Sequence, residues 1–252
     1  MRFASLGSGS SGNATLVEEG STCLLVDCGF SGRQIGERLA RLGKQPEQLT
    51  AILITHEHAD HTAGLAAVAR RYGLPVWMSH GTRFQHGGAG LPRLHHFCCH
   101  EPFAIDDICI EPFPVPHDAR EPCQFVFGNG QHRLGMLTDC GAITAYIREK
   151  LSGCDALLLE CNHDSDMLRN GPYPSFLKQR VAGCFGHLSN GQAAGLLRAV
   201  DVSALRHIVA MHLSGQNNTI PLVRAALGDA LGCERHWVAV AQQDAVLEWR
   251  TI

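Results

Sequence analysis

Four side chains that commonly bind metal ions stand close together, directly after a short apolar segment. Residues 51–54 predict a buried strand, and His56, His58, Asp60 and His61 follow it. Alternate side chains of an extended chain point the same way, so His56 and His58 share one side. Asp60 and His61 come after the chain turns and can reach a second ion. The residue four after His56 is Asp60, so the segment is not the helical H-E-x-x-H motif. Imidazole and carboxylate groups suit zinc, and also manganese or iron.

Short apolar runs alternate with segments of helical period, which predicts an α/β fold. We expect strands at residues 1–6, 14–17, 22–26, 51–54, 109–115, 124–127, 133–137, 156–159, 206–211 and 246–249. We expect helices at residues 31–42, 63–72, 174–182, 190–200 and 220–231. This order fits two packed sheets with helices outside. No repeat, charge block or low-complexity linker interrupts the sequence, so we expect a single domain over residues 1–252.

Composition constrains the setting of the protein more than its chemistry. Lys and Arg number 21 and Asp and Glu 24, so the formal charge is −3 and no basic excess announces a nucleic-acid partner, although a local basic patch is compatible with it. The 11 cysteines contain no C-x-x-C pair, and we expect them to act mainly as small buried apolar residues in a reducing cytoplasm. The start lacks the apolar core of a signal peptide, and no apolar run approaches the ~18 residues of a membrane span. We therefore expect no membrane partner, and the sequence carries no signal for an oligomeric state.

Further metal-binding side chains follow later predicted strands. His117, Asp139, Glu160 and His212 each stand directly after, or close after, the end of such a strand. In layered α/β folds the strand ends gather at one edge, and sites form there. A metal site is therefore the economical explanation for this distribution.

The pattern His56-x-His58-x-Asp60-His61 resembles the signature of the metallo-β-lactamase superfamily, and the later motifs match that family in order. The resemblance implies an αββα sandwich, in which two packed mixed sheets are flanked by helices and a metal pair lies at one edge. It implies two divalent ions, zinc or manganese, with iron also compatible. The implied ligands are His56, His58 and His117 for the first ion and Asp60, His61 and His212 for the second, with Asp139 bridging them.

Residues 159–164, 186–190 and 212–218 resemble the YycJ/WalJ-like branch of this superfamily. That branch is similar to tRNA 3′-processing endonucleases of the RNase Z type and is associated with 5′-to-3′ DNA exonuclease activity. Asp139 also occupies the place where classical zinc β-lactamases carry a cysteine. Two features of related nucleases are missing from the sequence, an inserted β-CASP domain and a tRNA-gripping arm. The resemblance implies hydrolysis of phosphodiesters in nucleic acid, with DNA favoured over RNA as the substrate.

Three residues are candidates for proton transfer. Asp60 is expected to orient or deprotonate a water that bridges the two ions. Glu160 and His187 are expected to form a proton relay in which His187 protonates the leaving oxygen. The alternative is a buried hydrogen-bonded pair that only orients a metal ligand. Both His187 and His212 precede a Leu-Ser pair, so their roles are exchangeable by sequence. The RNase Z-like order favours His212 as the ligand.

Other residues are candidates for substrate contact. The glycine-serine loop at residues 7–13 offers backbone N–H groups to an anion. Asn217 and Asn218 either contact phosphate or cap the following helix, and His163 either contacts substrate or is an ordinary loop residue. Asp27 is expected to steady the ligand loop, and Ser189 to be a helix N-cap. The substrate-contact candidates are Ser10, Asn13, His163, Asn217 and Asn218.

Two other functions are compatible with the same ligands. The first is a small-molecule metallo-hydrolase, such as a cyclic phosphodiesterase, thioesterase or lactonase. The Glu160 and His187 pair argues against thioesters and lactones, because an acid is needed mainly for a poor alkoxide leaving group. The second is a non-catalytic metal-binding regulatory module. The complete ligand set argues against it, since degraded relatives are expected to lose ligands.

Overall fold

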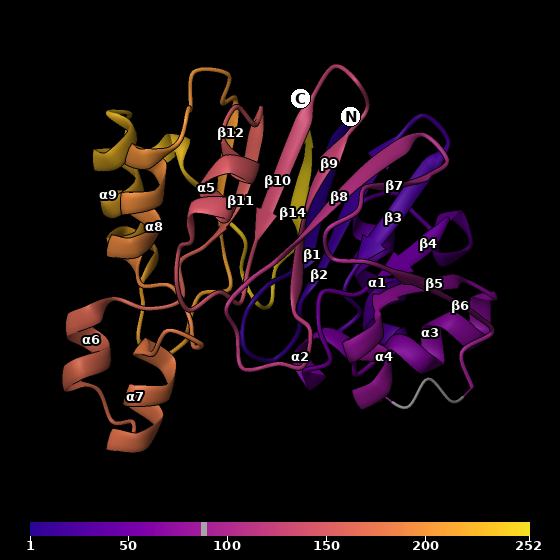
Figure 1. Ribbon diagram of the computed structural model, residues 1–252, viewed down its shortest axis with the longest axis horizontal. Coiled ribbons are helices and arrows are strands. Elements are labelled where there is room, and N and C mark those ends of the chain that lie inside the picture. Colours follow the sequence, from indigo (N-terminus) through magenta and orange to yellow (C-terminus); the bar gives the residue numbers. More distant parts are fainter. Residues whose placement is uncertain (87–89) are drawn as a thin grey trace.

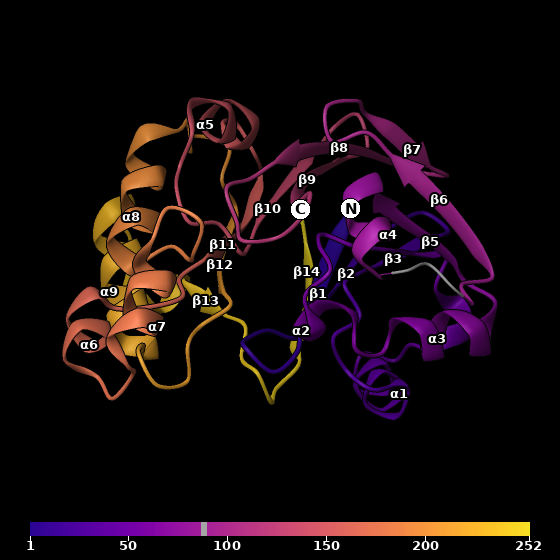
Figure 2. The same ribbon diagram turned by 60° about the horizontal axis from the view of Figure 1, so that its bottom comes forward.

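The computed structural model describes residues 1–86 and 90–252 and contains two sheets packed face to face with helices outside them (Figures 1 and 2). Each sheet has seven strands among the described residues. In Figure 1 the strands form the middle of the molecule, with α1, α3 and α4 on one side and α5, α8 and α9 on the other. This arrangement confirms the predicted αββα sandwich.

The first sheet carries both ends of the described chain, because the last strand pairs with the first. Its strand β1 is antiparallel to β14 and β2, β2 is antiparallel to β3, and the pairs from β3 to β6 are parallel. In spatial order its strands are β14 (Leu247–Thr251), β1 (Arg2–Gly7), β2 (Ala14–Glu19), β3 (Thr22–Val26), β4 (Ala51–Leu53), β5 (Pro75–Ser79) and β6 (Arg93–Phe97).

The second sheet has the same mixture of directions. The pairs from β10 to β13 are parallel, and the pairs from β10 back to β7 are antiparallel. In spatial order its strands are β13 (Ala239–Val240), β12 (His207–Met211), β11 (Ala156–Glu160), β10 (Arg133–Leu137), β9 (Cys123–Gly128), β8 (Ile108–Pro114) and β7 (Phe103–Ile105).

Helices and short 3-10 turns connect the strands. The helices are α1 (Gly32–Arg41), α2 (Ala59–Thr62), α3 (Leu65–Tyr72), α4 (His80–His86), α5 (Ala145–Leu151), α6 (Ser165–Asn170), α7 (Ser175–Ala182), α8 (Asn190–Ala199) and α9 (Ile220–Leu231), and the 3-10 turns are η1 (Pro46–Gln48) and η2 (Arg235–Trp237). Ser189 is the N-cap of α8, where its side chain accepts a hydrogen bond from the backbone N–H of Gln192, as the sequence predicts. Gly73 ends α3 in the left-handed conformation, with φ of 65°.

The core has three layers, because neighbouring residues of a strand face opposite sides of the sheet. Leu24 and Leu158 belong to the layer between the two sheets. Leu25, the next residue of β3, packs in the layer beneath α1 and α3. Leu157 and Leu159 of β11 pack in the layer beneath α5, α8 and α9. Burial on both faces explains why these strands are continuous apolar runs in the sequence.

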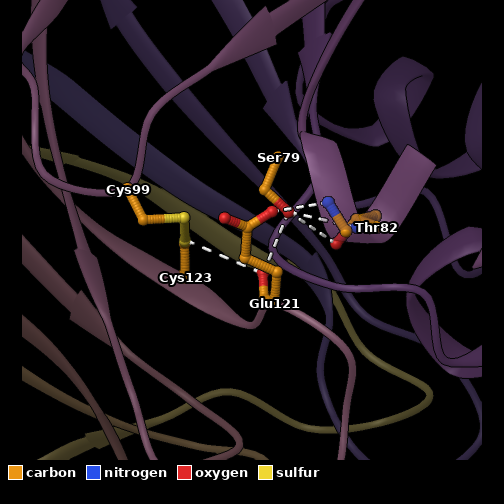
Figure 3. The surroundings of a disulfide bond; sticks show 6 residues. Ser79, Thr82, Cys99, Glu121 and Cys123 are labelled. Carbon is orange, nitrogen blue, oxygen red and sulfur yellow. Dashed lines mark hydrogen bonds between the residues drawn. A yellow bond between two sulfur atoms is a disulfide. The ribbon is translucent and has the colours of Figure 1, made fainter. Parts of the chain in front are cut away.

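A disulfide joins the two sheets near one of their edges. Cys99, just after β6, is bonded to Cys123, the first residue of β9 (Figure 3). Spacing alone does not predict this pair, because 24 residues separate the two cysteines along the chain. The expectation that cysteines are buried apolar residues holds for five of the free ones, Cys23, Cys28, Cys140, Cys154 and Cys161.

Several elements were not predicted from the sequence. The unpredicted elements are β5, β6, β7, β13, α2, α4, α5, α6 and the two 3-10 turns. The helix predicted from residue 63 begins at Leu65, since the ligand segment itself forms the short helix α2. No helix of the described residues is both long and apolar enough to cross a membrane. The single-domain organisation and the cytoplasmic setting stay predictions.

Strand direction places the polar residues of the predicted site at one edge of the sandwich. Strand β1 runs parallel to β3, because both are antiparallel to β2. By the same rule β8 runs parallel to β10, because both are antiparallel to β9. The carboxyl ends of β1, β3 and β4 therefore lie together, as do those of β8, β10, β11 and β12. The chain segments that follow these strands carry the candidate site, and α2 lies at this edge in Figure 1.

Candidate metal centre

Three histidines form the first group of possible metal ligands, here called the histidine group: His56, His58 and His117. His56 and His58 follow β4, and His117 follows β8. His58 Nδ1 lies 3.0 Å from His56 Nε2 and 3.3 Å from His117 Nε2. The rings of His56 and His117 are buried in the sandwich edge. The three nitrogens therefore converge on one point that a cation can occupy.

Two carboxylates and two histidines form the second group, here called the carboxylate group: Asp60, His61, Asp139 and His212. Asp60 Oδ2 lies 3.4 Å from both His61 Nε2 and His212 Nε2. Asp139 follows β10, and its Oδ2 lies 3.2 Å from His61 Nε2 while its Oδ1 lies 3.6 Å from His212 Nε2. The turn of α2 brings Asp60 and His61 to this group, while His56 and His58 face the other.

The donor set fits divalent cations. Four ligands at about 2.1 Å from a tetrahedral zinc ion are about 3.4 Å from one another, close to the distances within both groups. Asp139 Oδ1 also lies 3.9 Å from His117 Nε2, so this carboxylate stands between the groups. Its Oδ2 is buried and accepts no hydrogen bond in the described structure. Burial of this carboxylate is costly unless positive charge lies beside it, which His61 at 3.2 Å supplies in this structure and a bound cation would also supply. The two groups thus point to divalent metal binding.

The ring nitrogens that do not face the other donors also have close polar partners. His61 Nδ1 lies 2.7 Å from Asp27 Oδ2, and Asp27 also accepts a hydrogen bond from the backbone N–H of Thr55 at 2.9 Å. Thr55 Oγ1 lies 2.9 Å from His56 Nδ1. These contacts fix the orientation of each ring, which is the usual arrangement around protein-bound metals. The contacts of Asp27 support the predicted role of this residue.

Three further contacts of this kind had no signal in the sequence. His117 Nδ1 is hydrogen-bonded to the backbone oxygen of Gly186 at 3.1 Å. Asn162 Nδ2 donates to the backbone oxygen of His212 at 3.1 Å. Ser8 Oγ accepts a hydrogen bond from the backbone N–H of His212 at 2.9 Å. Their partners lie up to 204 residues away along the chain, so only folding brings them together.

The backbone adopts an unusual conformation at three residues of this edge. Asp27, Asp139 and His212 have φ values of 62°, 51° and 53°, in the left-handed region. This conformation costs a non-glycine residue about 1–3 kcal/mol and persists only where its surroundings enforce it. Asp27 and His212 directly follow β3 and β12, and Asp139 is the second residue after β10. The sharp left-handed turn therefore directs each side chain across the end of the sheets.

The pKa values of the histidines differ between the two groups. Burial holds the pKa of His56 well below its ordinary value, and burial also lowers that of His117. In the carboxylate group burial acts in the same direction, but the charge of Asp139 outweighs it. The pKa of His61 is therefore well above its ordinary value, and that of His212 is raised to about 10. His56 and His117 are therefore neutral at neutral pH, whereas His61 and His212 hold protons that a cation must displace.

Glu160 and His187 form a buried pair beside the carboxylate group. Glu160 is the last residue of β11, and its Oε1 lies 2.8 Å from His187 Nδ1. Its Oε2 accepts hydrogen bonds from the backbone N–H groups of Cys140 at 2.9 Å and Leu188 at 3.1 Å. Burial raises the pKa of Glu160, but the charge of His187 and hydrogen bonds with His187 and His212 lower it to about 2. Glu160 is therefore ionised and holds the His187 ring in place.

Geometry distinguishes His187 from His212, which sequence leaves exchangeable. His212 Nε2 faces Asp60 and Asp139 within the carboxylate group. His187 directs Nδ1 toward Glu160, and its side chain is 20% exposed. His187 Nδ1 is also 3.7 Å from Asp139 Oδ1, so the two histidines lie within one cluster. This arrangement supports His212 as a ligand and His187 as a proton donor.

The glycine-serine loop reaches the carboxylate group through one of its two predicted residues. Asn13 is buried, and its Nδ2 donates to Asp60 Oδ2 at 3.3 Å and lies 3.2 Å from His61 Nε2. Ser10 is exposed on the same loop and has no partner in the described structure that ties it to the donors. Asn13 is thus placed to position Asp60. Substrate contact by Ser10 and Asn13 stays a prediction.

The substrate candidates Asn217 and Asn218 belong to neither donor group. Asn218 Nδ2 donates to the backbone oxygen of Cys161 at 2.7 Å, and its side chain also pairs with Asn190. Asn217 is fully buried, and its Oδ1 accepts no hydrogen bond in the described structure. The alternative of helix capping is wrong for both, because Thr219 is the N-cap of α9. Asn218 still lines a cavity of about 400 Å³ together with Ser8 and Ser214, so its contact with substrate stays a prediction.

His163 lies just beyond Glu160 and faces a separate cavity. The residue is 2% exposed, and the described structure gives no hydrogen-bond partner to its Nδ1. Together with residues of α6 and α7 it lines a cavity of about 400 Å³. Burial lowers its pKa, so the ring is neutral at neutral pH. Contact with substrate stays a prediction for this residue.

Comparisons with known proteins agree with this geometry. The chain matches the β-lactamase superfamily domain over residues 22–213. It is 34% identical over 235 residues to Exodeoxyribonuclease YycJ of Bacillus anthracis, covering 92% of this chain and 89% of that protein. It is 35% identical over 236 residues to Exodeoxyribonuclease WalJ of Streptococcus pneumoniae, covering 91% of this chain and 88% of that protein. The solved metallo-β-lactamase fold protein YhfI from Bacillus subtilis shares the fold, with a TM-score of 0.75, 16% identity and coverage of 97% of this chain and 98% of that one.

Proposed function

Because this chain belongs to the β-lactamase superfamily, in the branch of the YycJ and WalJ exodeoxyribonucleases, we propose that this metal-dependent hydrolase is an exodeoxyribonuclease. The observation that carries the proposal is the Glu160 and His187 pair beside two donor groups that share Asp139. A hydrolase of esters with good leaving groups has little need of such an acid. Phosphodiesters in DNA have a poor alkoxide leaving group, so they require one.

The donor groups are proposed to hold two divalent cations, zinc or manganese. His56, His58 and His117 would hold the first, Asp60, His61 and His212 would hold the second, and Asp139 would contribute to both sites. When bound, the cations lower the pKa of a water molecule and offset the charge that develops on the phosphoryl oxygens. Elemental analysis of protein purified without chelator should approach two ions per chain. A folded preparation that binds one ion at most after reconstitution contradicts this dinuclear arrangement.

Asp60 orients the attacking water and accepts its proton. Burial raises the pKa of Asp60, but hydrogen bonds with His212 and His61 lower it below the ordinary value, so the carboxylate is ionised. Asn13 Nδ2 donates to the same Oδ2 atom and fixes the direction of the carboxylate. The water therefore meets a fixed acceptor at the moment it attacks phosphorus.

His187 donates a proton to the departing oxygen. Burial lowers the pKa of His187, but the charge of Glu160 and their hydrogen bond raise it above the ordinary value. The raised pKa favours the protonated ring, which can act as an acid. Nδ1 is engaged by Glu160 at 2.8 Å, so the proton on Nε2 is the one to be transferred.

Digestion of end-labelled oligonucleotides tests the proposal. Single- and double-stranded DNA and RNA are incubated with the protein and added Mn²⁺ or Zn²⁺. We expect mononucleotides to be released from DNA faster than from RNA. The resemblance of the sequence implies 5′-to-3′ polarity, so a 5′ label should be released before a 3′ label.

The same experiment also tests the alternative functions, each with its own substrate. Cyclic nucleotides, a thioester, a lactone and a β-lactam are offered to the same preparation. Rapid turnover of one of them, with nucleic acid left intact, assigns the small-molecule function instead. A preparation that holds both ions and turns over none of these substrates assigns a regulatory metal-binding role.

A further inference from the structure

The two helices α6 and α7 leave large aromatic side chains in solvent. Phe176 of α7 is 72% exposed and Phe185, just after α7, is 59% exposed. They are the two most exposed large hydrophobic side chains among the described residues. No residue of α7 is buried. Two exposed rings close together in sequence are not explained by packing, and such groups commonly mark a binding surface.

This surface is directly connected to the metal centre. The backbone oxygen of Phe185 accepts a hydrogen bond from the N–H of Asp118 at 2.9 Å, next to the ligand His117. The next residue, Gly186, holds His117 Nδ1, and the residue after that is His187. Both views show α6 and α7 side by side, at the end of the molecule where α2 lies (Figures 1 and 2). Phe185 therefore stands two residues before His187, in a segment whose backbone contacts the neighbour of His117.

The helices also carry positive charge that suits a phosphate backbone. The charged residues of α7 are Lys178 and Arg180, both basic. Lys178 Nζ donates to the backbone oxygen of Arg169 at 2.7 Å, a contact that leaves its charge unneutralised. Arg180 is paired with Asp118 at 2.6 Å and stays 59% exposed. Acidic residues lie in the same segment, since Asp166 is paired with Arg169 at 2.7 Å and Asp164 is the N-cap of α6, so Lys178 is the basic side chain that this surface offers to a phosphate.

A cavity between the two helices adds an unpartnered polar group. Arg169 and Lys178 line the cavity of about 400 Å³ that His163 also lines. His163 is almost fully buried, yet its Nδ1 has no hydrogen-bond partner among the described residues. A buried ring nitrogen without a partner is uncommon unless a ligand supplies the hydrogen bond. Ser165 lies on the same wall and offers a hydroxyl group.

We propose that residues 163–187 bind the single-stranded part of a DNA substrate, with bases stacked on Phe185 and Phe176 and a phosphate at Lys178. The inference rests on the proposed function and specifies its substrate class. Every base has an aromatic face, and base stacking on such side chains is tolerant of sequence. Paired bases within a duplex do not expose their faces to side chains. The surface therefore selects an unpaired strand and leads it to the metal centre.

The test compares variants of the two rings in the metal-loaded protein. Binding is measured by anisotropy of fluorescein-labelled (dT)20 with phosphorothioate linkages, and turnover on the ordinary oligonucleotide and on bis-p-nitrophenyl phosphate. Phe185→Leu keeps the apolar area but removes the aromatic face, and Phe185→Tyr keeps the face. We expect Phe185→Leu and Phe176→Leu each to weaken binding about tenfold, since stacking contributes about that much per base. The ratio of kcat/KM between oligonucleotide and small diester should fall by the same factor, and the tyrosine variants should restore both values.

Two controls isolate stacking from other effects. Leu222→Ala truncates an exposed apolar residue of α9 and should change neither binding nor turnover. An oligonucleotide of abasic sites should bind the wild type and Phe185→Leu equally. Lys178→Gln should reduce the slope of log affinity against log salt concentration by about 0.7, the value for one phosphate on a single strand.

Each outcome supports or overturns the inference. A wild type that cleaves DNA while the leucine variants keep full affinity overturns this inference and leaves the proposed function intact. A wild type that binds DNA through the two rings but does not cleave it overturns the proposed function alone. A wild type that neither binds nor cleaves overturns both. If Phe176→Leu instead dissociates a dimer in sedimentation velocity without changing DNA affinity, the surface joins two copies of the chain and the inference is wrong.

Discussion

The two donor groups stand side by side, yet they differ in charge and in how they hold protons. The histidine group has three imidazoles, and burial keeps the pKa of His56 and His117 low. The carboxylate group adds Asp60 and Asp139 to its imidazoles, and these charges raise the pKa of His61 and His212. A cation meets neutral nitrogens at His56 and His117 but displaces protons from His61 and His212.

This difference shows that the pKa of a ligand imidazole depends on the residue that contacts its other ring nitrogen. Thr55 and the backbone oxygen of Gly186 stand behind His56 and His117, and both are neutral. Asp27 and Glu160 stand behind His61 and His212, and both are carboxylates. A carboxylate behind an imidazole raises its basicity and strengthens it as a ligand. The groups are thus distinguished by the carboxylates behind the imidazoles as well as by Asp60 and Asp139.

Replacing the carboxylate between the groups should have the largest effect. Asp139 approaches both groups, so Asp139→Ala removes the charge that offsets repulsion between two cations. We expect metal content to fall in both groups and turnover to drop below detection. Elemental analysis and a DNA degradation assay on the same preparation measure this.

A matched control separates this effect from backbone strain. Asp106 also has positive φ, at 46°, but lies in the turn between β7 and β8. Asp106→Ala should change stability slightly and leave both ions and turnover in place. An Asp139→Ala variant with full metal content and normal activity would make Asp139 only a turn residue.

The second largest effects are expected from His212→Ala and His187→Ala, which distinguish a metal ligand from a general acid. His212→Ala should lose one ion, because Nε2 faces both carboxylates. His187→Ala should keep both ions and slow DNA hydrolysis about 10²–10⁴-fold, the usual contribution of a general acid. The loss should shrink on a p-nitrophenyl diester, whose leaving group departs without a proton.

Glu160 provides a second check on the same assignment. Glu160→Gln should resemble His187→Ala, and the double variant should be far from additive, because the pair acts as a unit. If His187→Ala loses an ion while His212→Ala does not, the two roles are reversed. An equal slowing of His187→Ala on both substrates would make the residue a substrate contact instead of an acid.

The two donor groups should also differ in the number of protons released when a cation binds, and this effect is smaller than those above. The pKa of His212 is raised to about 10 in the metal-free protein, so the ring is protonated at neutral pH. Below that pKa the apparent affinity for the cation should rise about tenfold per pH unit for each proton displaced. Cation binding to His56 and His117 should displace no protons above neutral pH, since burial lowers the pKa values of both rings. Calorimetric titration of metal-free protein at pH 6, 7 and 8, in buffers of different ionisation enthalpy, counts the protons, and equal proton release at both groups would remove the comparison.

The smallest effect on the metal centre is expected from the disulfide. The backbone N–H of Cys123 donates to the oxygen of Thr55, the neighbour of His56, so the cross-link adjoins the histidine group. Cys99→Ala opens a loop of 24 residues, which in the chain-entropy model lowers the free energy of unfolding by about 3–4 kcal/mol. We expect metal content and turnover to stay unchanged. Denaturation with urea measures the stability, and Cys109→Ala, an exposed free cysteine of β8, is the control. Selective loss of the ion in the histidine group would show that the cross-link supports it.

The strands whose bounds the sequence predicts best are those buried on both faces. The strands β3, β4 and β10 to β12 are short apolar runs between turns, and they appear within a residue or two of their predicted bounds. Strand β6 was missed because it lies at the edge of its sheet and carries Arg93, His95 and His96. Helix α6 was missed because its six residues bury only Leu168, too few for a helical period. Partial exposure removes the pattern on which such predictions depend.

The sequence by itself determined the type of chemistry and its place in the fold. Local spacing assigned His56 and Asp60 to different donor groups. His, Asp and Glu residues at or just after the ends of predicted strands indicated that the site lies at one edge of the sheets. Tertiary structure alone decided which residue stands behind each donor, such as Asp27 behind His61 or Ser8 beneath His212. It also decided that His187 faces Glu160 while its twin motif at His212 faces Asp139. Periodicity and spacing are local and survive in a linear sequence, whereas hydrogen bonds between residues as far as 204 positions apart exist only once the sheets have packed.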